Sequence, residues 1–251
     1  NSLPGVSLDA SALIRHYPGG QAMSHILGYV GGVTENERAE AVDSFGNSIY
    51  EMDDVKGKDG LELVFEETLR GEKGSQLSQL TVAGGTWEPV EGTIKPPKPG
   101  KNLTLTIDLE FQRACSEILA AGIQYSSRDR WALAERDPAR APKKEPGAGA
   151  IVAIDPNSGE VLAMVSYPHY DNQLFVNGIS QRKYDEYISE AANRPLVDRA
   201  VRGQYPPGST LKLFTAAAAL QERTITPETT YHCAGAIQVP FAWDQSKGNI
   251  H

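Results

Sequence analysis

The sequence lacks the features of several common functional classes. No apolar run approaches the about 18 residues that a membrane-spanning helix needs. Basic residues number 24 against 32 acidic ones, and the net charge of −8 argues against nucleic-acid binding, which needs a basic surface. Hydrophobic residues make up 40% of the chain, which is too many for a disordered protein. With 251 residues, the chain is long enough for two modest globular domains.

Metal-binding and redox patterns are missing as well. The two cysteines and five histidines show neither zinc-ligand spacing nor the H-E-x-x-H pattern. We therefore expect no metal and no cofactor. Cys115 lies in an apolar helical pattern and is predicted to be a buried hydrophobic residue rather than a reactive thiol. For Cys233, the sequence shows no pairing partner.

Proline and glycine divide the chain into two parts. Residues 1–98 are rich in strand and turn signals, and one helical pattern, at residues 60–69, ends near Gly71. The proline-rich segment at residues 93–100 is typical of a stiff connector between domains. We therefore predict a β-rich first domain, residues 1–98, and a second domain, residues 99–251.

The second domain begins with a predicted strand and helix. Residues 103–107 alternate between apolar and polar, as a half-buried strand does, and Asp108 is placed to cap a helix that runs to about Ala121. The charged residues 124–147 contain three prolines and predict an exposed loop or insertion.

A hairpin and further helices follow. Residues 150–154 and 161–165 flank the turn sequence Asp-Pro-Asn-Ser-Gly, which predicts a β-hairpin. A polar helix is expected at residues 181–192. A hairpin followed by helices favours an α+β fold with helices packed on an antiparallel sheet.

The most informative segment is QYPPGSTLK, residues 204–212. Two prolines and a glycine prevent a helix from extending backwards, so a helix should begin close to Ser209. The next residues, LFTAAAAL, favour a buried helix. Because positions i and i+3 share a helix face, Lys212 should lie within reach of the Ser209 hydroxyl. Burial and the helix dipole would favour a neutral Lys212 amine, so the pair matches a nucleophile beside its general base.

The pattern S-x-x-K alone is a weak signal, because the chain contains it twice. The second copy, Ser180 to Lys183, opens a polar segment in which Ser180 is predicted to be an ordinary helix N-cap. From the residues alone, Ser209 is open to two interpretations, a catalytic nucleophile or another cap.

Several segments resemble the class B penicillin-binding proteins, and among them the elongation type. The segment Tyr-Pro-Pro-Gly-Ser-Thr-x-Lys carries the S-x-x-K motif of that family. The matching segments that approach the serine are residues 167–175, 177–180 and 194–200, and those that resemble the family's N-terminal pedestal are residues 17–18, 25–31 and 60–62.

The resemblance implies a peptidoglycan D,D-transpeptidase that cross-links stem peptides in cell-wall elongation. Ser209 would form the acyl-enzyme, Lys212 would take its proton, and the Ser209 amide would donate to the oxyanion. β-Lactams would acylate the same serine. The resemblance also implies a partner glycan polymerase of the shape-elongation-division-sporulation family and a membrane anchor at the extracytoplasmic face of the cell membrane.

The sequence departs from the family in one respect. Neither S-x-N nor K-[ST]-G occurs in the 251 residues. We expect both motifs further along a longer protein, and we expect the present residues alone to be inactive. Two other functions stay open: a non-catalytic pedestal or scaffold that regulates a membrane glycan polymerase, and a serine enzyme that hydrolyses or senses β-lactams.

Overall fold

The computed structural model describes residues 15–80, 87–137, 147–232, 235, 238–241 and 244–250. The chain divides into two compact units, Asn1–Gly203 and Gln204–His251, and each is described by itself. Helices of the first unit are η1 (Gln21–Met23), α1 (Ser24–Leu27), α2 (Glu35–Glu40), α3 (Gly60–Val64), α4 (Glu66–Leu69), α5 (Leu109–Arg136), α6 (Gln173–Val176), α7 (Gln181–Ile188) and α8 (Arg199–Arg202).

Each sheet of the described residues is a two-stranded antiparallel pair. The combination of helices and antiparallel strands confirms the predicted α+β class. No helix in the part of the chain described above combines the length and apolar character of a membrane span. In the first unit the strands are β1 (Val30–Gly32), β2 (Val55–Gly57), β3 (Ser78–Leu80), β4 (Trp87–Pro89), β5 (Gly149–Ile154) and β6 (Val161–Tyr167).

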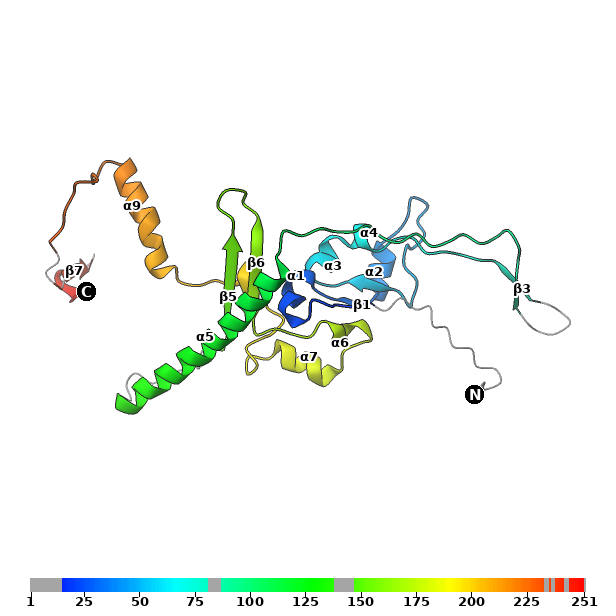
Figure 1. The fold of residues 1–251 in the computed structure, drawn as a ribbon, viewed down its shortest axis with the longest axis horizontal. Helices are drawn as coiled ribbons and strands as arrows, with labels where there is room; N and C mark the ends of the chain where they lie inside the picture. Colours follow the sequence, from blue (N-terminus) through cyan, green and yellow to red (C-terminus); the bar gives the residue numbers. More distant parts are fainter. Residues whose placement is uncertain are drawn as a thin grey trace. The chain divides into compact units, whose positions relative to one another are not determined.

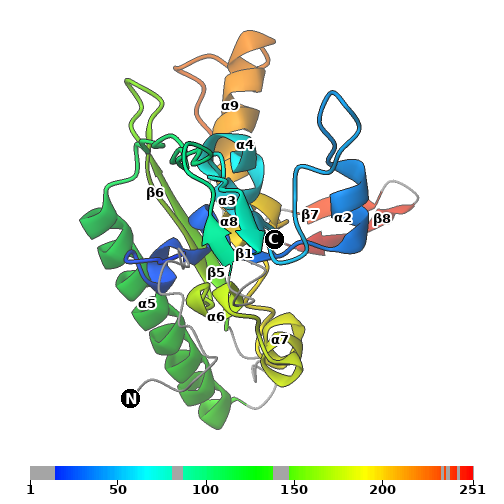
Figure 2. The same ribbon diagram turned by 90° about the vertical axis from the view of Figure 1, so that its right-hand side faces the viewer.

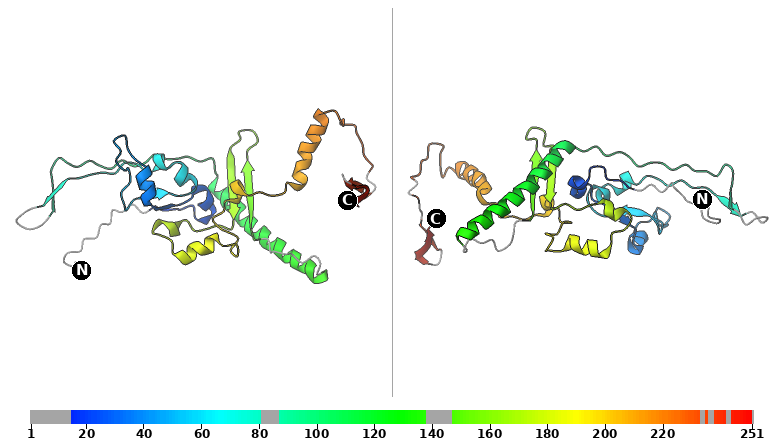
Figure 3. Two further views of the ribbon diagram at one scale, coloured as in Figure 1. Left: turned by 180° about the vertical axis from the view of Figure 1, so that it is seen from behind. Right: turned by 60° about the horizontal axis from the view of Figure 1, so that its bottom comes forward.

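The pedestal, by which we mean the described residues up to 98, is built from short elements. Helices α3 and α4 confirm the helical pattern predicted for residues 60–69, with a break at Phe65. Helices α1 and α2 were not predicted. For α2 a signal existed, since Thr34 and Glu37 form a capping box at its start. Strands β3 and β4 belong to an arm that extends away from α1–α4 (Figures 1 and 3).

Gly28 lets two pedestal segments meet. Its φ of 74° lies in the region that favours glycine, and a Cβ atom there would fall 1.8 Å from the carbonyl oxygen of Asp59. Only glycine therefore allows the end of α1 to touch the start of α3.

The predicted β-hairpin is confirmed as β5 and β6, which pair from Gly149–Tyr167 to Ile154–Val161. Helix α5 lies across this hairpin (Figures 1 and 3). Cys115 of α5 packs there against Ala163 and Val165, and it is buried, as predicted. Burial of these apolar side chains stabilises the packing of helix on hairpin.

A second core is aromatic. Tyr170, Phe175 and Tyr187 are buried together, and Tyr29 of the pedestal stacks on Phe175 with ring centroids 3.9 Å apart. Helices α6 and α7, which contribute Phe175 and Tyr187, lie next to each other (Figures 1 and 2). Aromatic packing therefore joins the pedestal to the residues that follow β6.

Gln112 of α5 fixes the outer edge of β6. Its side-chain amide accepts a hydrogen bond from the Met164 N–H and donates to the Met164 carbonyl, each at 2.8 Å. The same amide donates to the carbonyl of Ala22 in the pedestal. The side chain of Gln112 is fully buried, so it acts as a substitute for a neighbouring strand and connects three parts of the unit.

Two predictions for the second part of the chain were wrong. Residues 103–107 form no strand, although the neighbouring Asp108 N–H and the Thr106 hydroxyl bond to the edge of β6. Asp108 does cap the helix, by accepting from the N–H of Phe111. The helix continues to Arg136, so the loop predicted for 124–147 is wrong over 124–136, where no proline interrupts the helix-forming residues. Residues 138–146 lie outside the described part.

We predict that Gln112→Leu destabilises the protein by about 3 kcal/mol, because it leaves the partly buried backbone groups of Met164 and Ala22 without these partners. Glu117→Leu on the exposed side of α5 is the matched control and should change the free energy of unfolding by less than about 0.5 kcal/mol. Chemical denaturation of the two variants measures the difference. Equal effects would show that the three bonds do not stabilise the fold.

Candidate active site

Ser209 lies where the helix was predicted to begin. The second unit contains η3 (Gly208–Thr210), α9 (Leu211–Gln221), and the strand pair β7 (Gln238–Phe241) and β8 (Asp244–Ile250). The φ of Gly208 is 54°, a conformation that glycine adopts without strain. The Pro207 carbonyl accepts hydrogen bonds from both the N–H and the hydroxyl of Thr210. Thr210 therefore supplies the bonds that close the first turn.

The Ser209 hydroxyl has no capping role. Ser209 is the middle residue of η3, and neither η3 nor α9 has a side-chain cap. Ser180 behaves differently, as predicted: its backbone is extended, and its hydroxyl accepts from the N–H of Lys183 at the start of α7. The two S-x-x-K copies are thus structurally distinct, and the capping interpretation applies to Ser180 alone.

The lysines of the two copies also differ. Lys183 forms an ion pair with Glu186 at 2.8 Å. Lys212 lies in the first turn of α9, three residues beyond Ser209. No hydrogen bond or ion pair of Lys212 is found within the described ranges of the second unit.

The predicted burial of α9 is wrong for the described residues. Leu213 is 78% exposed and Phe214 is 73% exposed. The described residues of the second unit provide this helix and one strand pair, and they do not cover its apolar side chains. Composition predicted the helix correctly but could not say what packs against it.

The segments that resemble the family's approach to the serine lie in the first unit and attach the pedestal. Tyr170 donates its hydroxyl hydrogen to the carbonyl of Ser24 at 2.9 Å. Asn172 donates to the carbonyl of Gly28 at 3.0 Å. Both side chains are almost fully buried. Sequence reasoning missed this role, although polar residues inside an aromatic segment were a signal that they needed specific partners.

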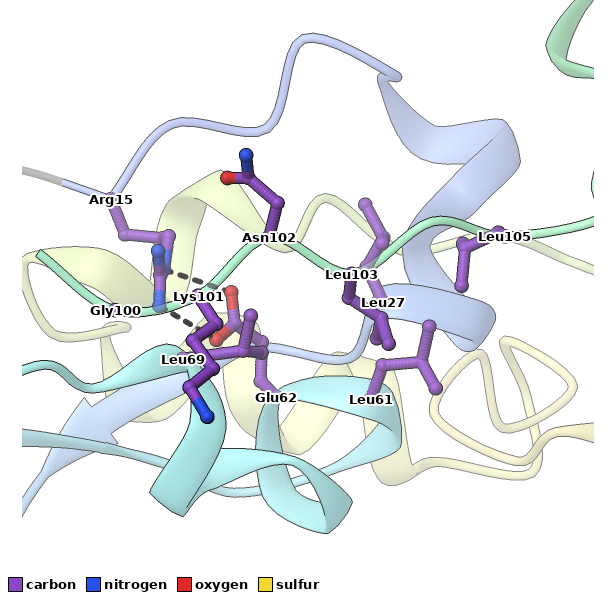
Figure 4. A pocket seen from close by; sticks show the side chains of 10 residues that line it. All are labelled: Arg15, Leu27, Leu61, Glu62, Leu69, Gly100, Lys101, Asn102, Leu103 and Leu105. Carbon is purple, nitrogen blue, oxygen red and sulfur yellow. Dashed lines mark hydrogen bonds and ion pairs between the residues drawn. The ribbon is translucent and has the colours of Figure 1, made fainter.

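A pocket of about 360 Å³ lies between the pedestal and residues 100–105, and it contains none of the residues around Ser209 (Figure 4). Glu62, which is 6% exposed, forms an ion pair with Arg15 there at 2.8 Å. Burial raises the pKa of the Glu62 carboxyl, while Arg15 opposes that shift. The remaining lining consists of Leu27, Leu61, Leu69, Gly100, Lys101, Asn102, Leu103 and Leu105.

Groups of three or more potential metal ligands are absent from the residues that the structure describes. Cys233, for which the sequence shows no pairing partner, lies outside those residues.

Comparison with known families agrees with the motifs. The model of the "Penicillin-binding Protein dimerisation domain" matches residues 1–105, and that of the "Penicillin binding protein transpeptidase domain" matches residues 149–250. The chain belongs to the penicillin-binding proteins.

Individual relatives carry the names peptidoglycan D,D-transpeptidase MrdA and penicillin-binding protein 2. The chain is 38% identical over 228 residues to peptidoglycan D,D-transpeptidase MrdA of Haemophilus influenzae, covering 90% of this chain and 30% of that protein. It is similar to penicillin-binding protein 2 of Pseudomonas aeruginosa in complex with WCK 5153, with a TM-score of 0.63 and 32% identity over 97% of this chain and 44% of the other.

A third match is a structure described as "Structural coordination of polymerization and crosslinking by a peptidoglycan synthase complex", with a TM-score of 0.72, 33% identity, and coverage of 88% of this chain and 35% of the other. The chain spans about a third of the length of the Haemophilus influenzae relative. The predicted resemblance to penicillin-binding protein 2, the elongation type of class B enzyme, is confirmed.

We predict that Ser180→Ala lowers the free energy of unfolding by about 1 kcal/mol, because it removes the cap of α7. Ser209→Ala, which removes no cap, should lower it by less than about 0.5 kcal/mol. Denaturation of both variants makes the comparison. A larger loss for Ser209→Ala would mean that its hydroxyl is structural.

Proposed function

We propose that the protein is a peptidoglycan D,D-transpeptidase of cell-wall elongation, with Ser209 as the nucleophile and Lys212 as its base. The observation that carries the assignment is the contrast between the two S-x-x-K copies. Ser180 caps α7, and Lys183 pairs with Glu186. Ser209 lies inside the first helical turn, and within the described residues its hydroxyl caps neither η3 nor α9, which leaves that hydroxyl available for chemistry.

The reaction consists of two acyl transfers. The Ser209 oxygen attacks the carbonyl carbon of the penultimate D-alanine in a donor stem peptide, and its proton passes to Lys212. The bond to the terminal D-alanine breaks, and that amine leaves with a proton. An amine of a neighbouring stem peptide then attacks the ester, forms the cross-link and returns Ser209 to its hydroxyl form.

The helix start suits this chemistry. Backbone N–H groups in the first turn of a helix have no intrahelical partners, and the N–H of Ser209 belongs to that turn. A negative oxygen that develops during acyl transfer is stabilised by such donors. β-Lactams, whose strained amide presents a similar carbonyl, acylate Ser209 in the same way.

The domain assignment is part of the same proposal. We assign residues 1–98 to a non-catalytic pedestal and residues 99–251 to the transpeptidase part. A membrane glycan polymerase of the shape-elongation-division-sporulation family is the proposed partner, supported by the similarity to a component of a peptidoglycan synthase complex. Because the proposed substrate is peptidoglycan, the proposed location is the extracytoplasmic face of the bacterial cell membrane.

The first test is covalent labelling of the full-length protein with fluorescent benzylpenicillin. We expect labelling of the wild type and of Ser180→Ala, and none of Ser209→Ala, because only Ser209 forms the ester. Near-ultraviolet circular dichroism of each variant serves as the folding control. Labelling of a folded Ser209→Ala protein would refute the assignment.

A second test concerns the base. Lys212→Met should lower the second-order rate constant of acylation by about 100-fold or more, the usual effect of removing a general base. Lys183→Met, the matched change in the other copy, should leave the rate within about twofold, since it removes a structural ion pair with Glu186 and a cation–π contact with Tyr187. Equal rates for the two variants would exclude Lys212 as the base.

A further inference from the structure

Two histidines from distant parts of the chain meet where the pedestal joins the rest of the first unit. His25 belongs to α1, and His169 follows β6. Their ring centroids are 6.3 Å apart. His25 is buried, and His169 is partly buried with its Nδ1 atom shielded from solvent. Neither histidine belongs to the segment around Ser209, and the proposed reaction assigns them no role.

The hydrogen bond of His25 fixes a hydrogen on its Nε2 atom and by itself favours the charged ring, against the effect of burial. Its Nε2 atom lies 2.7 Å from the carbonyl oxygen of Pro195, which only accepts, so Nε2 carries a hydrogen. Tyr170 packs edge-on against the same ring, with centroids 5.1 Å apart. The imidazole therefore bridges α1 and the segment before α8.

The surroundings of His169 oppose a positive charge more strongly. Its Nε2 atom lies 2.6 Å from the Ser116 hydroxyl of α5. Among the described residues Nδ1 has no partner of good hydrogen-bond geometry, although the nearby backbone of Ser166 favours the charged ring and partly offsets the effect of burial. Tyr167 packs edge-on against the ring. An imidazolium carries a hydrogen on both nitrogens, so protonation would either bury an unpaired N–H or require the ring to move.

Charged groups near the pair are few. Asp198 and Asp59 favour a charged His25, and Arg199 opposes it, whereas the charged group acting on His169 is His25 itself. Burial lowers the pKa of His25. Burial, and then the positive charge of His25, lower the pKa of His169 to about 4.

We propose that His25 and His169 form an acid-sensitive contact that loosens the attachment of α1 to the residues around β6 when the pH falls. When both rings are neutral, the contact is intact. Adding protons places like charges close together in a buried site, and opening the contact returns both rings to water. Tyr170 donates to the Ser24 carbonyl and Asn172 to the Gly28 carbonyl, and none of these groups gains or loses a proton in this pH range. These two bonds therefore remain, and the loosening is local.

The sign follows from proton linkage. Above about pH 6.5, the ordinary pKa of histidine, both the closed and the open contact hold neutral rings, and the stabilisation is complete. As the pH falls from about 6.5 towards 4, the open form binds protons that the closed form excludes, so the closed form loses stability. A protein on the outer face of the membrane, as proposed above, meets such pH values directly.

The test is hydrogen exchange of α1 in the full-length protein at pH 7.5 and pH 5.0, expressed as protection factors. We expect the wild-type protection of residues 24–28 to fall by about tenfold or more, the change that one pKa unit produces. The double variant His25→Gln and His169→Gln retains side-chain amides near the Nε2 positions but cannot titrate, so its protection should change by less than about twofold. His16→Gln, at an exposed position, should behave as the wild type.

An equal fall in the wild type and the double variant would overturn the proposal, and so would no fall in the wild type. If the double variant does not fold, NMR titration of the wild-type histidines decides: a His169 that is charged at pH 6 contradicts the proposal, and one that is neutral at pH 5 supports it. Penicillin labelling of Ser209 at pH 7.5 is independent of the pair, so failure here leaves the proposed function untouched.

Discussion

The first unit depends on polar side chains that are buried where the pedestal meets the residues around β6. Gln112 makes three hydrogen bonds there, since its one amide pairs with both backbone groups of Met164 and also with the Ala22 carbonyl. Tyr170 and Asn172 complete the connection. Buried donors and acceptors are costly when unpaired, so these bonds allow few alternative arrangements. The pedestal is thereby held by specific partners and not by apolar contact alone.

The same chemistry distinguishes the two serine–lysine pairs. At Ser180 an extended backbone precedes the helix, and the hydroxyl turns inward to cap it. At Ser209 the Pro-Pro-Gly sequence starts the first turn one residue earlier, so the serine is already helical and its oxygen is not needed by the backbone. A short change in the sequence before the helix therefore separates a capping serine from the serine that we propose as the nucleophile.

Much of this could be predicted from local patterns. The hairpin, the Asp108 cap, the Ser180 cap and the helix start near Ser209 follow from rules that act over a few residues. Sequence reasoning failed where the structure depends on contacts between residues that are far apart in the chain. The charged composition of residues 124–136 did not reveal a helix, the apolar α9 did not reveal its exposure, and His25 and His169 meet across more than 140 residues of chain. Their pairing depends on the completed fold.

The measurement that most directly tests the central claim is to trap the acyl-enzyme formed from a stem peptide ending in D-Ala-D-Ala and map it by mass spectrometry. Trypsin should release residues 203–212 as one peptide, which contains Ser209 and Thr210. We predict that the full-length protein carries the acyl group on Ser209 and releases one D-alanine for each ester formed. An acyl group on Ser180 or any other residue, or release of D-alanine without an ester, would contradict the account.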